Sequence, residues 1–327
     1  MSKFVAQLQL ALLDRRTIRT IVWFIITGAS LYLGTVFWLG WQDTMAAFAA
    51  LGAHTLLIGI LVASSSYLWR FARWERTLQY MGNSVPRFKH LVIYLSGIPL
   101  TATPGKVGET FRSALLFQHG VRIPHSLAAF LVDRGTDVLG MILLGTLASI
   151  IAEQHSFWIW LLSFSALLLG TRLFAYMQSH PIASAGWNRL ARYMAWLPIK
   201  GGQATLAAWA HVWTLPIASS FSVIAMVAYG THALIFAWFC HILNTGISIA
   251  DCVLMFVQAT LFGAATMIPG GLGAMEAALA FQLIEHGVSD VNAISLAIST
   301  RLLTLWLGVL TGIVCLLFLS AKDLKSE

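Results

Sequence analysis

The chain has 327 residues, of which 58% are hydrophobic and only 10% are charged, and its formal net charge is +7. Soluble domains carry about 25% charged residues, so this composition excludes an ordinary soluble protein and indicates helices that cross a membrane several times. The apolar runs are long and continuous instead of alternating, which argues against a membrane barrel. No basic soluble domain is present to bind nucleic acid, so we expect the positive charge at the cytoplasmic face.

The N-terminal part begins with basic residues and two apolar runs. Lys3, Arg15 and Arg16 precede the first run, at 18–39, so the positive-inside rule predicts a cytoplasmic N-terminus. This run lacks a small-residue cleavage site, which favours a retained span over a signal peptide. A second span is predicted at 54–70. It is followed by basic residues that we expect in a cytoplasmic loop, namely Arg70, Arg73, Arg76, Arg87 and Lys89.

The segment 91–117 is apolar enough to lie in a membrane, but prolines and glycines interrupt it. Pro99 removes a backbone donor and should end the helix that enters this segment. Thr103 followed by Pro104 is typical of a helix start, so a second helix should follow the break. Such a break is tolerated only inside protein or beside a cavity, and its free N–H groups favour an anion. The break and the predicted anion site comprise Pro104, Gly105, Lys106, Gly108, Glu109 and Arg112.

Four further spans are predicted, at 125–151, 157–177, 216–240 and 292–319. The first of them carries Asp133, Arg134 and Asp137, and the last carries Arg301. Before the last span lies a second broken segment, 251–286, interrupted by Pro269, Gly270, Gly271 and Gly273. The segment 181–213 places apolar and basic residues on opposite sides of a helix, which predicts an amphipathic insert in the cytoplasmic interface.

The two broken segments resemble one another. The motif Pro104-Gly-x-x-Gly-Glu is similar to Pro269-Gly-Gly-Leu-Gly-Ala-Met-Glu, and each precedes a span with an arginine. Arg134 follows Pro104 by 30 residues, and Arg301 follows Pro269 by 32. The order of spans and broken segment therefore occurs twice. Broken helices at matching places in two halves indicate a transporter site near the membrane midplane.

This pattern predicts an all-α polytopic membrane protein with one transmembrane domain. We expect six or seven full transmembrane helices plus two broken re-entrant segments, arranged in two inverted repeats at about 18–152 and 156–320. The alternative count makes 251–268 a full crossing and leaves the C-terminus outside. Either way, we expect a multi-pass protein of the cell (inner) membrane with its N-terminus in the cytoplasm.

These motifs resemble the flippase-like family related to the transmembrane domain of lysylphosphatidylglycerol synthases, the MprF type. The resemblance extends from the first span to the last, and it implies a lipid-translocating membrane module. Asp133 departs from the family pattern, which more often has Glu before the arginine. No soluble aminoacyl-transfer domain follows Glu327, so we expect translocation and not lipid synthesis. The matching features are Pro104-Gly-x-x-Gly-Glu109-x-x-Arg112, Asp133-Arg134-x-x-Asp137, Pro269-Gly-Gly-Leu-Gly-x-x-Glu276, and Arg301 with Trp306.

A charged group inside an apolar helix costs at least about 2.5–3.5 kcal/mol, so each should have a partner or face a cavity. For Arg112, Arg134 and Arg301 we favour phosphate contact, because a guanidinium matches phosphate bidentately. The structural alternative pairs Arg134 with Asp133 or Asp137, and Arg301 with Glu276. Glu109 and Glu276 would hold the arginines or carry a coupling proton. Asp133 and Asp137 fit a transport pathway or an ion pair equally well, and Lys106 fits a phosphate contact or cytoplasmic water.

Other chemistries find little support in the sequence. The ten histidines show no H-E-x-x-H spacing, the three cysteines show no C-x-x-C spacing, and no nucleophile elbow or P-loop is present. We therefore predict no cofactor and no metal, and a transporter of phosphate-bearing lipid instead of an enzyme. The substrate would be an anionic or aminoacylated phospholipid or a polyprenyl-phosphate-linked lipid. The alternatives are an intramembrane enzyme acting on a lipid phosphate, and a lipid-binding accessory protein. The expected partners are membrane lipids, with a separate lipid-synthesising enzyme as a further candidate.

Overall fold

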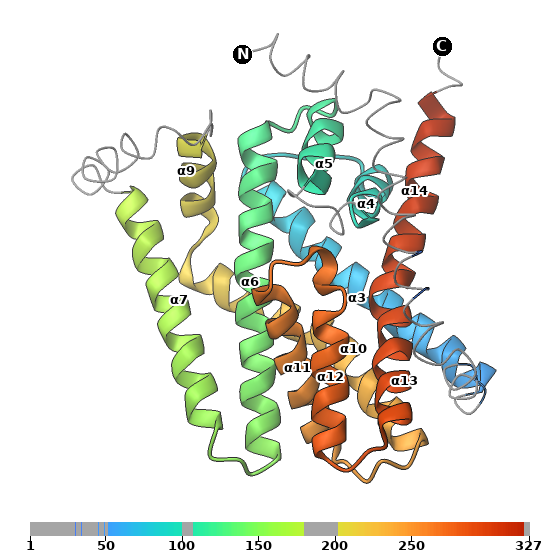
Figure 1. The fold of residues 1–327 in the computed structure, drawn as a ribbon. Coiled ribbons are helices and arrows are strands. Elements are labelled where there is room, and N and C mark those ends of the chain that lie inside the picture. The colour runs from blue at the N-terminus through green and yellow to red at the C-terminus, as the bar shows by residue number, and fades with distance from the viewer. Residues whose placement is uncertain are drawn as a thin grey trace.

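A computed structural model describes residues 52–99, 107–179 and 202–323, together with the single positions 30, 34, 45 and 49. These residues form helices and contain no β-strand (Figure 1). The long helices are α3 (Ala53–Tyr80), α6 (Ile123–Ile151), α7 (Phe157–Ser179) and α10 (Leu215–Ile242). The shorter ones are α4 (Arg87–Ser96), α5 (Val107–Phe117), α9 (Gly202–Val212), α11 (Ile249–Ala265), η3 (Pro269–Gly271), α12 (Ala274–Glu285), α13 (Asp290–Arg301), η4 (Leu302–Trp306) and α14 (Leu307–Asp323).

Four stretches of the described chain are long and apolar enough to cross a membrane. They are α3, the α7 stretch Phe157–Met177, α10, and the continuous run Asp290–Leu319 through α13, η4 and α14. The all-helical membrane class is thereby confirmed. Apart from positions 30 and 34, the predicted first span lies outside the described residues, as does most of the predicted insert at 181–213. The two-repeat division stays a prediction.

Helix α3 continues ten residues beyond the predicted end of the second span, to Tyr80. The prediction of a cytoplasmic loop beginning at Arg70 was therefore wrong. No glycine or proline interrupts residues 53–80, and Phe71, Trp74 and Leu78 follow helical spacing and are buried in one apolar cluster. This burial stabilises the last turns of the helix, although the basic residues of this stretch are as frequent as in a loop. Arg70 and Arg73 consequently lie inside the helical bundle.

The second broken segment folds as a hairpin of α11 and α12, joined by the short turn η3. Gly270, Gly271 and Gly273 have φ values of 63°, 63° and 80°. Residues with a side chain rarely adopt such angles, so glycine at these positions permits the turn. Helix α4, which enters the first broken segment, begins at Arg87 and not at the predicted Leu91, so Arg87 and Lys89 lie in a helix and not in the predicted loop. It ends at Ser96, before Pro99, as predicted. In Figure 1, α4 and α5 lie beside the upper parts of α14 and α6, whereas the α11–α12 hairpin lies beside the lower part of α6.

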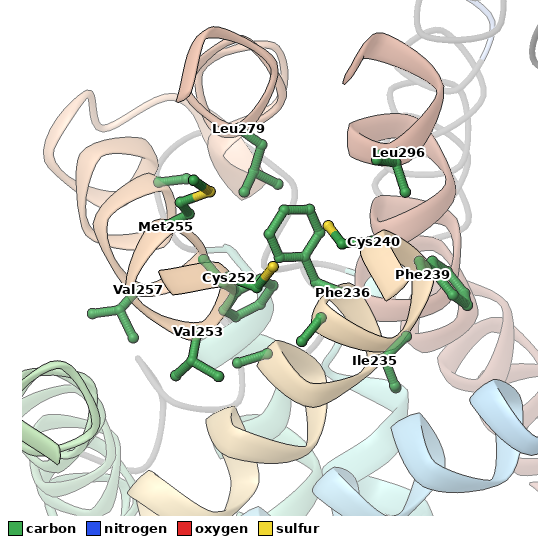
Figure 2. Packing of buried hydrophobic residues seen from close by; sticks show 14 of the residues in the cluster. Ile235, Phe236, Phe239, Cys240, Cys252, Val253, Met255, Val257, Leu279 and Leu296 are labelled. Carbon is green, nitrogen blue, oxygen red and sulfur yellow. The ribbon is translucent and has the colours of Figure 1, made fainter. Parts of the chain in front are cut away.

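The largest apolar cluster joins α10 and α11 to α6, α12 and α13. Figure 2 shows Phe236 of α10 near Cys252 of α11 and Leu279 of α12. Cys240 and Cys252, both fully buried, lie in this cluster as free thiols. The cluster packs the hairpin against the long helices, and this packing fixes the position of the hairpin along α6.

Helices α6 and α10 touch at Gly140. A methyl group there would lie 2.5 Å from Ala225 Cβ and 2.7 Å from Met226 N, so Gly140→Ala should force the helices apart. We expect the variant to lose about 1–3 kcal/mol of stability. Gly170→Ala on α7 is the matched control, because nothing lies within 4 Å of that position. Thermal unfolding in detergent measures both, and equal transition temperatures for the two variants would contradict this packing.

Candidate functional site

Helices α3 and α6 meet around the guanidinium of Arg73. Arg73 Nε donates to Asp133 Oδ1 at 2.9 Å, and Arg73 Nη2 donates to Asp137 Oδ1 at 2.6 Å. The two aspartates are one turn apart on α6, so their carboxylates face α3 together. Arg73 is 1% exposed, and Asp133 and Asp137 are equally buried. This triad is a buried ion network that fastens α3 to α6.

Arg134 is the more open member of the same network. Its Nη2 lies 3.2 Å from Asp137 Oδ2. The Arg134 side chain is 51% exposed, whereas that of Asp137 is buried. Its guanidinium also lies 5.6 Å from the ring centre of Phe130. The structural alternative for Arg134, an ion pair with Asp137, is therefore present, but half of the side chain is left accessible to a ligand.

Arg70 lies one turn before Arg73 on α3, and its Cζ is 4.4 Å from the ring centre of Tyr229 on α10. Tyr229 is within electrostatic range of Asp137 and Arg134 as well. The polar centre of the bundle therefore includes residues of α3, α6 and α10. We call Arg70, Arg73, Asp133, Arg134 and Asp137 the central cluster.

Arg112 of α5 is buried between aromatic rings. Its Cζ lies 4.5 Å from the ring centre of Tyr94 and 4.8 Å from that of Trp74, and its Nη2 donates to Tyr94 O at 3.2 Å. Gly97 leaves room for this side chain, because a methyl group there would lie 2.7 Å from Arg112 Nε. Stacking of this kind stabilises a desolvated cation by up to about 2 kcal/mol. Arg112 therefore joins α5 to α4 and α3, beside the central cluster.

Arg301 closes the second break. Its Nε donates to Glu276 Oε1 at 3.1 Å, its Nη1 lies 3.3 Å from Met275 Sδ, and its Nη2 donates to the carbonyl of Gly270. The predicted pair of Arg301 with Glu276 is thus formed, and the arginine also satisfies a carbonyl that the hairpin turn leaves without a helical partner. The π-helical turn η4 begins immediately after Arg301, and such turns often occur at functional sites.

His232 of α10 forms a buried polar pair with Ser66 of α3. This histidine is within electrostatic range of both Arg70 and Arg301, and its Nε2 lies 2.8 Å from Ser66 Oγ on α3. Ser66 and His232 are both buried. This buried pair joins α10 to α3 in the interior of the bundle.

Several predicted site residues cannot be placed in this arrangement. Pro104, Gly105 and Lys106 lie outside the described residues, and Gly108 and Glu109 lie in α5 without described side chains. Pro269 begins the turn η3, and its side chain is likewise not described. Within the described residues, no group of three or more His, Cys, Asp or Glu side chains is placed to hold a metal ion.

The two arginines of α3 that complete the central cluster were not predicted from the sequence. Two signals were available. Arg70 and Arg73 are one turn apart, so they share a helical face, and no helix breaker separates them from the span before them. The aspartates at i and i+4 on a neighbouring span also require a cation, and Arg134 on their own helix takes only one of them directly.

A groove of about 760 Å³ between α3 and α4 is separate from the central cluster. Its walls are mostly apolar, with Leu68, Trp69 and Phe88 all substantially exposed. Leu68 and Trp69 of α3 lie on a different face of the helix from Arg70 and Arg73, which point into the bundle. The groove is therefore a hydrocarbon-like surface and not the polar site.

These features define an all-helical membrane protein with buried arginines at its centre and a glycine-rich helix break closed by a further arginine. Residues 24–312 match the family model of the lysylphosphatidylglycerol synthase transmembrane region. This match spans most of the 327 residues, so the chain belongs to that family. No curated protein matches the chain in a separate comparison.

Proposed function

We propose that the protein moves a phosphate-bearing lipid between the two leaflets of a cell (inner) membrane, with its N-terminus in the cytoplasm. The observation that carries this proposal is the central cluster, where two arginines pair with two aspartates and Arg70 lies against Tyr229 of α10. Asp137 stands midway along α6, and Tyr229, beside Arg70, stands midway along α10. Charged residues at such depth usually face a pathway and bind a substrate or one another.

The arrangement of the two breaks supports the same function. We interpret α4–α5 and α11–α12 as re-entrant segments that enter from opposite sides, because they lie beside opposite ends of the bundle (Figure 1). Inverted repeats that meet at a midplane site are typical of transporters that expose one site to each side in turn. The headgroup would then cross among the arginines while its tail remains in lipid.

In this mechanism the buried ion pairs hold the helices and the accessible guanidiniums meet the phosphate. Arg73 joins α3 to α6, and Arg301 joins the hairpin to α13. Arg134 is half-exposed and is positioned to contact a headgroup without leaving Asp137. Rocking of one half against the other changes which side the pathway opens to, and the buried ion pairs keep each half rigid.

Transport in liposomes tests the proposal. Reconstituted protein should accelerate the passage of fluorescent phosphatidylglycerol between leaflets, measured as the fraction accessible to an external quencher over time. Arg134→Ala should slow this passage about ten-fold to a hundred-fold, the effect expected for the loss of one charge-assisted contact. Arg76→Ala is the control, since Arg76 is exposed on α3 and outside the cluster, and it should leave the rate unchanged.

Mass spectrometry of the same liposomes separates the rival functions. A new lipid product would favour an intramembrane enzyme acting on the phosphate. If the lipid neither moves nor changes chemically, the remaining candidate is a lipid-binding accessory protein. The buried Ser66–His232 pair is the nearest arrangement to a nucleophile and base, but the Ser66 hydroxyl already donates to Ala63 O at 2.8 Å. His232 therefore serves Ser66 as a donor, which favours transport over catalysis.

A further inference from the structure

The groove between α3 and α4 is apolar along its walls and charged on the side nearest the turn that joins the two helices. Arg87, the first residue of α4, lines the groove, and its Nε donates to Glu75 Oε2 at 3.1 Å. Glu75 follows Ala72 by three residues, so it continues the face of α3 that lines the groove. The other lining residues are Ser65, Leu68, Trp69, Phe71, Phe88 and Leu91.

The walls of this groove favour a hydrocarbon occupant. Leu68, Trp69 and Phe88 are all substantially exposed along it, and the groove has a volume of about 760 Å³. Such walls offer water few hydrogen-bond partners, whereas an apolar chain that covers them removes their surface from water. Helix α3 is a candidate membrane span, so the hydrocarbon at hand is an acyl chain of the bilayer.

The charged side of the groove favours a phosphate of net negative charge. The Arg87 side chain is 78% exposed, whereas that of Glu75 is 8% exposed. The Nε of Arg87 serves Glu75, and the N–H groups of its terminal nitrogens are left for a ligand. Arg76, exposed one turn after Ala72 on the same face of α3, adds a second cation. Two guanidiniums and one carboxylate leave one positive charge in excess.

We propose that the groove holds a resident anionic phospholipid that is distinct from the transported molecule, with an acyl chain between α3 and α4 and its phosphate on Arg87. The bound chain covers Trp69 and Phe88 and joins α4 to α3. A guanidinium suits this role because its paired N–H groups match two phosphate oxygens. The site lies on a different face of α3 from the central cluster, and the assignment does not depend on the proposed transport.

Photo-crosslinking to the purified full-length protein in detergent tests the site. The probe is phosphatidylglycerol with a diazirine in its acyl chain, and peptide mass spectrometry locates the adducts. We expect adducts to concentrate at 65–72 and 88–91. Unlabelled phosphatidylglycerol should suppress these adducts at about ten-fold lower concentration than phosphatidylethanolamine of the same chain length, because only the first carries a net negative charge.

Two substitutions should change groove labelling in opposite directions. Arg87→Gln should reduce it about ten-fold and remove the preference for phosphatidylglycerol. Glu75→Gln should increase affinity for phosphatidylglycerol about three-fold to ten-fold, because it removes the nearby negative charge and frees Arg87 Nε. A purely structural Glu75–Arg87 pair would be weakened by both variants alike. Lys89→Gln is the control, because Lys89 is exposed on α4 outside the lining residues, and it should behave as wild type.

Three results would overturn the assignment. Adducts spread evenly over α3, α4 and the exposed apolar face of α7 would show general contact with the bilayer only. Equal suppression by the two lipids, or weaker binding of phosphatidylglycerol in Glu75→Gln, would also overturn it. Transport in liposomes is a separate measurement: Arg87→Gln should move phosphatidylglycerol at the wild-type rate, and a slower rate would make the groove part of the pathway. If wild type labels the groove but moves no lipid, transport fails while the groove site stands.

Discussion

Replacing Arg73 with glutamine should destabilise the protein by about 3–5 kcal/mol, the usual cost of removing one partner from a buried ion network. The variant leaves Asp133 and Asp137 buried without the cation that bonds to both, at 2.9 and 2.6 Å. Arg134 then faces two carboxylates while reaching only Asp137. We expect a large decrease in the thermal transition temperature in detergent, or failure to accumulate in the membrane.

The control for this prediction is Arg76→Gln, which removes the same charge from an exposed position on the same helix. It should change stability by no more than about 0.5 kcal/mol. Adding Asp133→Asn to Arg73→Gln should recover part of the loss, because one buried negative charge is then removed with the positive one. A double variant that is as unstable as the sum of its parts would show that the two side chains do not interact.

Replacing Arg301 with glutamine should have a comparable effect, again about 3–5 kcal/mol, because it leaves Glu276 buried and unpaired. The carbonyl of Gly270 also loses its donor, so the hairpin turn should open first. Hydrogen exchange measures this locally: amides around η3 and the start of α12 should exchange faster than those in α6 and α7. The thermal transition should fall as well.

A second substitution and an exposed carboxylate provide the controls for Arg301. The double variant Arg301→Gln with Glu276→Gln should be more stable than Arg301→Gln alone, because no buried charge then lacks its partner. Glu285→Gln, exposed near the end of the same helix as Glu276, should behave as wild type. Uniform exchange across the whole protein in Arg301→Gln would contradict a local role at the hairpin.

The features that the sequence predicts well are those that local chemistry determines. The span predicted at 157–177 corresponds to α7, Phe157–Ser179. A continuous apolar run between polar ends determines both the type of element and its approximate bounds. The second break could be located because proline and three glycines specify a turn that other residues resist, and Gly270, Gly271 and Gly273 do have positive φ values. The pair of Arg301 with Glu276 was among the stated alternatives, since a buried cation needs a nearby anion.

The features that the sequence did not reveal depend on contacts between distant segments. Arg73 meets aspartates 60 and 64 residues later in the chain, and within its own segment it looks like one of several cytoplasmic arginines. The burial of Phe71, Trp74 and Leu78 against other helices is what extends α3 and brings Arg70 and Arg73 into the bundle. Tyr229 carried no signal, because its role comes from the helix that packs opposite it.

A density map of the protein in nanodiscs of phosphatidylglycerol would test the central claim most directly. We expect phosphate density within hydrogen-bond distance of Arg70 or Arg134, between α3, α6 and α10, with the lipid tails leading out of the bundle. Phosphate density confined to the outer surface, for example along the groove between α3 and α4, with the guanidinium of Arg70 in dry contact with protein alone, would contradict it.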